Sequence, residues 1–177
     1  GGMFRWAAPL FALGDRRWSD DDASVFAEWL RPAVPRGGRL LDLGGGTGRL
    51  GELLAARLSC SVTILDASPH MLRYASRRRT LTTVEGDASA MPFADASFDG
   101  VVSVDAFHHF RSQAEVAREV ARVLRPGGVL VVAELDPGDR GARWVAVGER
   151  LLREPAALVA PGELAALFAA VGITGPA

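Results

Sequence analysis

The chain has 177 residues, a length that suits one domain with a hydrophobic core of its own. Apolar residues make up 49% of it and the formal net charge is −1, which argues against a disordered chain and against nucleic acid or an anionic membrane as a partner. All 20 basic residues are arginine, so this chain offers no lysine for a Schiff base. The single cysteine, Cys60, excludes an internal disulfide and a multi-cysteine metal site, and we predict no bound metal.

The N-terminal segment, residues 3–37, predicts an aromatic arm followed by a helix. Ser19 precedes three aspartates, which is typical of a helix start because the hydroxyl caps free N–H groups and the carboxylates favour the positive end of the helix. We expect this segment to cover one larger domain at residues 38–177. The chain shows neither a secretory signal nor an apolar run of about 18 residues, so we expect a cytoplasmic location and no membrane span.

Beyond residue 38, short apolar runs alternate with segments of helical periodicity. The predicted strands cover Leu40–Leu43, Ser61–Asp66, Leu81–Glu85, Phe98–Val104 and Val129–Leu135. The predicted helices cover Leu50–Leu58, Pro69–Arg79, Gln113–Leu124, Ala142–Arg153 and Pro161–Val171. This alternation predicts β-α-β units, so we expect an α/β fold built on a parallel sheet that is covered on both faces.

The most informative segment is the glycine-rich turn after the first strand, LDLGGGTG at residues 41–48. Glycines let bare backbone N–H groups approach a ligand, and the following helix would point its N-terminus at the same place. Two interpretations are open here. Gly46, Gly48 and Gly51, with Asp66 further along, match a dinucleotide-binding fingerprint, whereas a count from Gly44 produces apolar-Asp-apolar-Gly-x-Gly-x-Gly.

The second interpretation resembles motif I of the class I S-adenosylmethionine-dependent methyltransferases, and further matching motifs follow in order through residues 38–136. The segment Val104–Phe110, with paired histidines, is similar to the type 11 group that includes the ubiquinone and menaquinone biosynthesis methyltransferases. The resemblance implies a Rossmann-like, doubly wound sheet, with the five visible strands in the order 3-2-1-4-5. The family's usual C-terminal antiparallel strand pair has no counterpart here, which favours a truncated chain or, second, a homodimer that covers the exposed fifth strand.

The resemblance implies S-adenosylmethionine as cofactor and S-adenosylhomocysteine as its product. The predicted cofactor residues are Asp42, Gly44, Gly45, Gly46, Gly48, Asp66, Ala67, Met71, Asp87, Ala88 and Val104. In the family the first aspartate and the glycines organise the methionine end, while Asp66 would accept hydrogen bonds from both ribose hydroxyls. Met71 would cover the adenine, Asp87 would accept from its amino group, and the Ala88 N–H would meet the ring.

Methyl transfer requires the acceptor, the methyl group and the sulfur to lie in line, and a base only if the acceptor still carries its proton. The candidate catalytic residues are Asp105, His108 and His109, and we favour His109 because an unperturbed histidine titrates near neutral pH. The two histidines could instead be packed or capping residues. Glu134 and Asp136, at the end of the fifth strand, are lower-ranked candidates for a base or a substrate contact.

The acceptor cannot be read from the sequence. We expect the acceptor to be a small, partly apolar molecule, bound beneath a lid formed by the N-terminal arm and Pro137–Pro161. We expect neither nucleic acid nor a membrane as a partner, and a homodimer is possible. The leading hypothesis is a methyltransferase that uses in-line displacement. One alternative is an S-adenosylmethionine-binding protein without transferase activity, and another is a nicotinamide-dependent oxidoreductase.

Three further polar features favour a structural role. Asp99 is expected to stabilise the fold, and His70 to lie on the surface. The run Arg77–Arg79 is expected to be a solvated helix end that complements the helix dipole.

Overall fold

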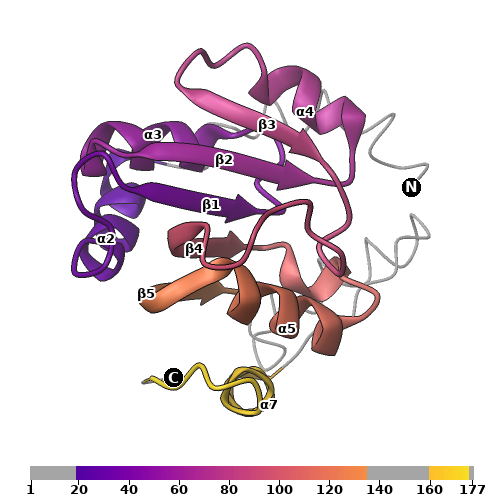
Figure 1. Cartoon of the computed structure of the whole chain (residues 1–177). Helices are drawn as coiled ribbons and strands as arrows, with labels where there is room; N and C mark the ends of the chain where they lie inside the picture. The colour runs from indigo at the N-terminus through magenta and orange to yellow at the C-terminus, as the bar shows by residue number, and fades with distance from the viewer. Residues whose placement is uncertain (1–18, 135–159, 176–177) are drawn as a thin grey trace.

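The computed structural model describes residues 19–134 and 160–175 (Figure 1). Its strands are β1 (Arg39–Leu43), β2 (Ser61–Asp66), β3 (Leu81–Glu85), β4 (Phe98–Val104) and β5 (Leu124–Ala133). Its helices are α2 (Asp20–Leu30), α3 (Arg49–Leu58), α4 (Pro69–Ala75), α5 (Gln113–Val123), α7 (Pro161–Ala169) and the short 3-10 helix η2 (Phe107–His109). The predicted aromatic arm and the helix predicted at Ala142–Arg153 lie outside the described residues, and the division at residue 37 stays a prediction.

The five strands form one parallel sheet in the order β3-β2-β1-β4-β5, which confirms the predicted fold class and strand order. The arrowheads of β1, β2 and β3 point toward the same edge of the sheet in Figure 1. β1 and β4 are the central strands and are buried over nearly their whole length, as strands covered on both faces must be. The strand order reverses between β1 and β4, and ligands of open α/β sheets bind in the crevice at such a point.

Two apolar clusters cover the two faces of the sheet. Successive side chains of a strand point to opposite faces, so neighbouring residues of β1 enter different clusters. Leu40 packs with apolar residues of α2 and α3, whereas Leu41 packs with residues of α5 and with Phe168 of α7. The helices therefore hold the sheet as a middle layer, and its carboxyl edge is the place where loops from five strands meet.

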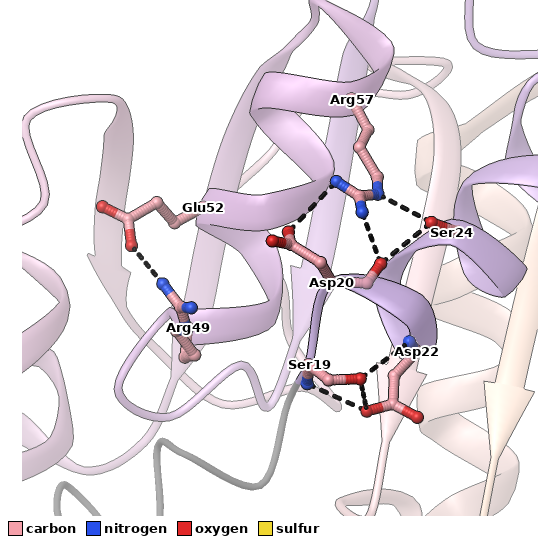
Figure 2. Close-up of polar contacts among 7 residues, drawn as sticks. All are labelled: Ser19, Asp20, Asp22, Ser24, Arg49, Glu52 and Arg57. Carbon is pink, nitrogen blue, oxygen red and sulfur yellow. Dashed lines mark hydrogen bonds and ion pairs between the residues drawn. The ribbon is translucent and has the colours of Figure 1, made fainter.

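Helix α2 begins at the predicted cap and is tied to α3 by a set of polar contacts (Figure 2). Ser19 and Asp22 form a capping box, in which each side chain accepts from the other's backbone N–H. Arg57 of α3 donates from Nε to Ser24 Oγ at 3.1 Å and pairs with the Asp20 carboxylate at 3.2 Å. The contacts are mostly solvent-exposed, so they orient α2 against α3 more than they stabilise the domain.

Strand β5 starts earlier than the predicted Val129. Leu124 pairs with Phe98, and the register then shifts before Val129 pairs with Gly100. Gly127, with φ +78°, lies in the irregular stretch that absorbs this shift. The predicted strand end at Leu135 lies outside the described residues. No described strand pairs with the outer edge of β5, so the homodimer stays a prediction.

Two helices end before their predicted C-termini. α4 ends at Ala75 instead of Arg79, because the chain turns back and carries Arg78 toward the glycine-rich turn. α7 ends at Ala169 instead of Val171, and Gly172 follows with φ +85°. The predicted helices Leu50–Leu58 and Gln113–Leu124 match α3 and α5 to within one residue at each end.

Candidate active site

The carboxyl edge of the sheet gathers every predicted cofactor and catalytic residue. The glycine-rich turn follows β1, Asp66 ends β2, and Asp87 follows β3. Asp105 begins the loop after β4, and Glu134 follows β5. Residues that are far apart in the sequence thus share one edge, which is where open parallel sheets bind ligands. Asp136 and the predicted lid segments lie outside the described residues.

The glycine-rich turn depends on glycine at two positions because of close packing. Gly44 has φ +73°, and a Cβ there would lie 2.5 Å from the Cβ of Ala106. Gly48 has φ +75°, and a Cβ there would lie 2.6 Å from Leu81 Cδ1. Gly46 also has a positive φ of +54°, but a Cβ built on it meets no atom of the described structure within 4 Å. The turn therefore packs tightly at both ends, and among the described residues nothing fills the space beside Gly46.

Asp42 lies beneath this turn and is 3% exposed. A Cβ on Gly45 would come within 2.6 Å of its carboxyl carbon, and one on Gly51 within 2.9 Å of Oδ2. Burial, reinforced by the negative charge of Asp66, raises the pKa of Asp42 to about 7, and a backbone hydrogen bond from Gly51 opposes this rise. Oδ2 has no hydrogen-bond partner within the described part of the chain. A buried carboxylate of this kind fits a ligand that brings hydrogen-bond donors or a positive charge.

Asp66 connects the glycine-rich turn to the start of α4. Its Oδ2 accepts from the backbone N–H of Gly46 at 2.9 Å, and its Oδ1 accepts from that of Ser68 at 2.8 Å. Burial raises the pKa of Asp66, while these two hydrogen bonds and the charge of His109 lower it. Each oxygen has a second lone pair, so the carboxylate can still accept from a pair of ligand hydroxyls. The bond to Gly46 is a turn-organising role that the sequence analysis missed.

Asp87 occupies an exposed turn after β3. Its Oδ1 accepts from both the backbone N–H and the hydroxyl of Ser89 at 2.8 Å, and these bonds lower the pKa of the carboxyl. The apolar residues predicted beside the adenine differ in exposure: Met71 and Ala88 are buried, whereas Ala67 is exposed. Val104 is half-buried at the end of β4. Met71, Ala88 and Asp87 lie on the β2 and β3 side of the turn, whereas Val104 lies on the β4 side.

The loop after β4 is held by Glu134. Its Oε1 accepts from the backbone N–H of Ala106 at 3.0 Å and of Phe107 at 2.7 Å, and its Oε2 pairs with His108 Nδ1. The His108 and Glu134 side chains are only 2% and 8% exposed. Glu134 was predicted at this edge, but no sequence signal reveals its contacts, because its backbone partners lie 27 and 28 residues away.

The two histidines occupy different environments. His108 is buried, whereas His109 is half-buried, and their ring centroids are 4.1 Å apart. His109 is near enough to the Asp66 carboxylate for its charge to lower the pKa of that group. Asp105 precedes them with φ +49° and donates its N–H to the carbonyl of Ala133 at 2.9 Å. Of the three predicted catalytic residues, His109 is the one whose charge acts on the Asp66 carboxyl.

Arg78 is a contributor to the site that the sequence analysis did not identify. It was predicted as part of a solvated run, but it is half-buried, donates from Nε to the carbonyl of Thr47 at 3.0 Å and pairs with Glu52. Arg78 therefore ties the glycine-rich turn to the start of β3.

Asp99, as predicted, is structural: it accepts from the backbone N–H of Arg39 at 2.7 Å.

Residues 19–134 and 160–175 contain no group of three histidine, cysteine, aspartate or glutamate side chains arranged to hold a metal ion. None of the helices within these ranges is long and apolar enough to cross a bilayer. The cytoplasmic location stays a prediction.

Comparison with known proteins identifies the family. A family model described as a methyltransferase domain matches residues 41–132. The chain belongs to this methyltransferase domain family. The match spans the glycine-rich turn, all three aspartates at the strand ends and the paired histidines, so the family that these motifs predicted is confirmed.

Individual methyltransferases show how far the similarity extends. Demethylmenaquinone methyltransferase of Thermus thermophilus is 36% identical over 79% of this chain and 67% of its own length. The 2-methyl-6-phytyl-1,4-hydroquinone methyltransferase of Synechocystis is 37% identical over 67% of this chain and 39% of its own length. A putative methyltransferase of Haloferax volcanii, solved with the Trm112 activator, has a TM-score of 0.75 at 25% identity over 86% of this chain and 68% of its own. The chain spans between 39% and 67% of the length of the curated relatives that it matches.

Proposed function

We propose that this methyltransferase domain binds S-adenosylmethionine at the carboxyl edge of β1 to β4 and transfers the methyl group to a small molecule. The observation that carries the proposal is the pair of carboxylates around the glycine-rich turn. Asp42 lies buried beneath the turn with Oδ2 free of any described partner, and Asp66 holds the turn from the side through Gly46. One carboxylate suits an ammonium group and the other suits vicinal hydroxyls, and both groups occur in this cofactor.

Six of the predicted cofactor residues are assigned to particular parts of the cofactor. The open face of Gly46 leaves room for the methionine part above Asp42. Asp66 accepts the ribose hydroxyls on the lone pairs that Gly46 and Ser68 do not use. On the β3 side, Met71 and Ala88 form apolar walls for the adenine, and Asp87 accepts from its amino group.

The cofactor supplies an activated methyl group on a positively charged sulfur, which leaves as a neutral thioether. The residues of this chain therefore have to bind, orient and exclude water rather than create a strong nucleophile. His109 is half-buried beside Asp66, which is a suitable place to accept a proton from the acceptor. Asp105 is the second candidate in the same loop.

The acceptor is proposed to be a small, partly apolar aromatic molecule such as a hydroquinone. This step rests on the names of the two curated relatives, one a demethylmenaquinone and the other a hydroquinone methyltransferase. A hydroquinone carries acidic hydroxyl groups, and loss of one proton makes its ring a better nucleophile. This need for a base supports the proposed role of His109, which lies in the loop after β4.

Calorimetry and a methyl-transfer assay test the proposal. We expect S-adenosylmethionine and S-adenosylhomocysteine to bind and NAD to produce no heat. Radiolabelled methyl groups from the cofactor should then appear in organic extracts when 2-methyl-1,4-naphthohydroquinone is the probe. Cofactor binding without transfer to any of a panel of small acceptors would favour the alternative of a binding protein without transferase activity. Heat from NAD alone would overturn the proposal.

A further inference from the structure

We propose that Glu134 is a positioning residue of the active site: it holds the Ala106–His109 turn in one conformation and keeps a proton on Nδ1 of His108. The inference gains its catalytic meaning from the proposed function, but the contacts that carry it belong to the chain alone. They join the end of β5 to the loop after β4.

The first part of the inference concerns the backbone. Glu134 Oε1 accepts from the N–H groups of Ala106 and Phe107 at 3.0 and 2.7 Å. Both of these residues are buried, at 6% and 0% exposure, so water cannot replace the carboxylate as their acceptor. Buried N–H groups that lose their partner are costly, and the turn would therefore rearrange if this oxygen were removed.

The second part concerns the imidazole. Glu134 Oε2 pairs with His108 Nδ1, and both side chains are almost fully buried. An ionised carboxylate can only accept hydrogen bonds, so the proton of this contact is carried by Nδ1. In the neutral form of the imidazole the lone pair is then at Nε2, because the carboxylate sets which of the two ring nitrogens keeps its proton.

The third part concerns what the held turn touches. The ring of His108 lies 4.1 Å, centroid to centroid, from that of His109, the proposed base. On the other side, the Cβ of Ala106 occupies the space that a Cβ on Gly44 would need. The turn that Glu134 holds therefore carries the candidate base His109 and packs against the glycine-rich turn.

The backbone of Asp105, in the same loop, is also held by the end of β5. Asp105 has a left-handed φ of +49°, a conformation that residues other than glycine adopt rarely and that aspartate tolerates better than most. Its N–H bonds the carbonyl of Ala133, the neighbour of Glu134 in the chain, so β5 holds this residue and the following turn from adjacent positions. A direct role of Glu134 as a base is disfavoured, because both of its oxygens already accept hydrogen bonds from buried groups.

Histidine NMR on the whole chain tests the inference without an activity assay. The chain has three histidines, so ¹⁵N-histidine labelling with the variants His70→Gln and His109→Gln assigns every ring. We expect the wild-type spectrum to show His108 protonated at Nδ1. In Glu134→Gln the single amide oxygen will accept from the backbone and the amide NH₂ will face the ring, so His108 should change to the Nε2–H tautomer. Glu115→Gln, the same change on an exposed position of α5, should leave the spectrum unaltered.

Binding of S-adenosylhomocysteine provides a second readout. In Glu134→Gln the Ala106–His109 turn is no longer held. If it then adopts the conformation that binds S-adenosylhomocysteine about a tenth of the time, the apparent Kd for this ligand rises about tenfold. A wild-type His108 that is protonated only at Nε2, or a Glu134→Gln protein with unchanged tautomer and affinity, would overturn the inference. If Glu134→Gln fails to fold, the wild-type tautomer alone decides. A wild type that binds no S-adenosylhomocysteine contradicts the proposed function, while the histidine spectrum still tests the role of Glu134.

Discussion

Glu134 and His108 form a buried carboxylate–imidazole pair between the end of β5 and the loop after β4, 26 residues apart in the chain. Through the same carboxylate the turn of the paired histidines is held against the sheet. The cofactor turn is organised in a similar way by Asp66, which accepts from Gly46 across 20 residues. Two carboxylates at strand ends thus hold the two loops that meet where Gly44 packs against Ala106.

Removal of the Asp66 carboxylate should weaken cofactor binding strongly. The variant Asp66→Ala loses both the bond to Gly46 and the acceptor for the ribose hydroxyls. A hydrogen bond to a charged group is worth about 1.5–3 kcal/mol, so the loss of one ribose bond should raise the Kd for S-adenosylhomocysteine in calorimetry about 10- to 100-fold, and the loss of both should raise it further. Asp21→Ala, on the exposed surface of α2, is the matched control. Unchanged affinity in Asp66→Ala would contradict the ribose assignment.

The buried Asp42 carboxyl should make stability depend on pH. Its pKa is about 7 in the folded protein, whereas the ordinary value of 3.8 applies to the unfolded chain. Between these two pH values the folded chain binds a proton that the unfolded chain releases. The unfolded state binds fewer protons in this window, and the free energy of unfolding therefore falls as pH rises through it, by about 1.4 kcal/mol for each pH unit. Above about pH 7 this contribution is lost and the dependence levels off.

The variant Asp42→Asn measures this contribution in urea unfolding at pH 5 and pH 8. The free energy of unfolding of Asp42→Asn, taken relative to that of wild type at the same pH, should be about 2.5 kcal/mol higher at pH 8 than at pH 5, because wild type loses this contribution over that range and the amide does not titrate. Asp21→Asn should show no such difference. A wild-type and Asp42→Asn pair with parallel pH profiles would show that the carboxyl titrates normally.

The ionisation of Asp42 should also affect ligand binding. The proposed partner of this carboxylate is an ammonium group, which requires the ionised form, so affinity for S-adenosylhomocysteine should rise with pH up to and just beyond 7. Binding near pH 7 should then release a proton, and the observed heat should depend on the ionisation enthalpy of the buffer. Asp42→Asn should bind more weakly and without this buffer dependence; a buffer-dependent heat that persists in the variant would assign the proton to another group.

Alanine at Gly44 should disturb the contact between the two loops. The new Cβ would lie 2.5 Å from the Cβ of Ala106, in addition to the strain of φ +73°. We expect Gly44→Ala to lower the free energy of unfolding by about 3 kcal/mol in urea. Gly127→Ala separates the two effects, because that residue has φ +78° with no described atom within 4 Å of the added Cβ, and it should cost only about 1 kcal/mol. Equal losses in both variants would show that the loop contact contributes nothing.

Truncation of Arg78 should loosen the glycine-rich turn and leave the carboxylates of Asp42 and Asp66 in place. Arg78→Ala removes the bond to the Thr47 carbonyl and the ion pair with Glu52, and we expect about 1 kcal/mol of lost stability with a roughly fivefold higher Kd for S-adenosylhomocysteine. Arg79→Ala, at an exposed neighbouring position, is the control and should behave as wild type. If both variants bind alike, Arg78 does not position the turn.

The sequence by itself determined the parallel α/β fold and, through its motifs, the family, and the resemblance to that family implied the strand order and the edge at which the site residues meet. Apolar runs that alternate with amphipathic segments can satisfy their backbone and bury their apolar faces only as a layered α/β fold, and the strand ends that carry Asp66, Asp87 and the paired histidines then fall on one side. These features depend on local pattern, which a sequence displays directly.

The tertiary structure decided which side chains hold which loops. The bonds of Glu134 to the His108 turn, of Asp66 to Gly46 and of Arg78 to Thr47 join residues 20 to 31 positions apart, and no local pattern encodes such pairs. The left-handed Asp105 and the contact of Gly44 with Ala106 likewise exist only because two loops pack together. Long-range packing and burial determine the protonation and orientation of the site, since both depend on neighbours that the chain brings close only when it folds.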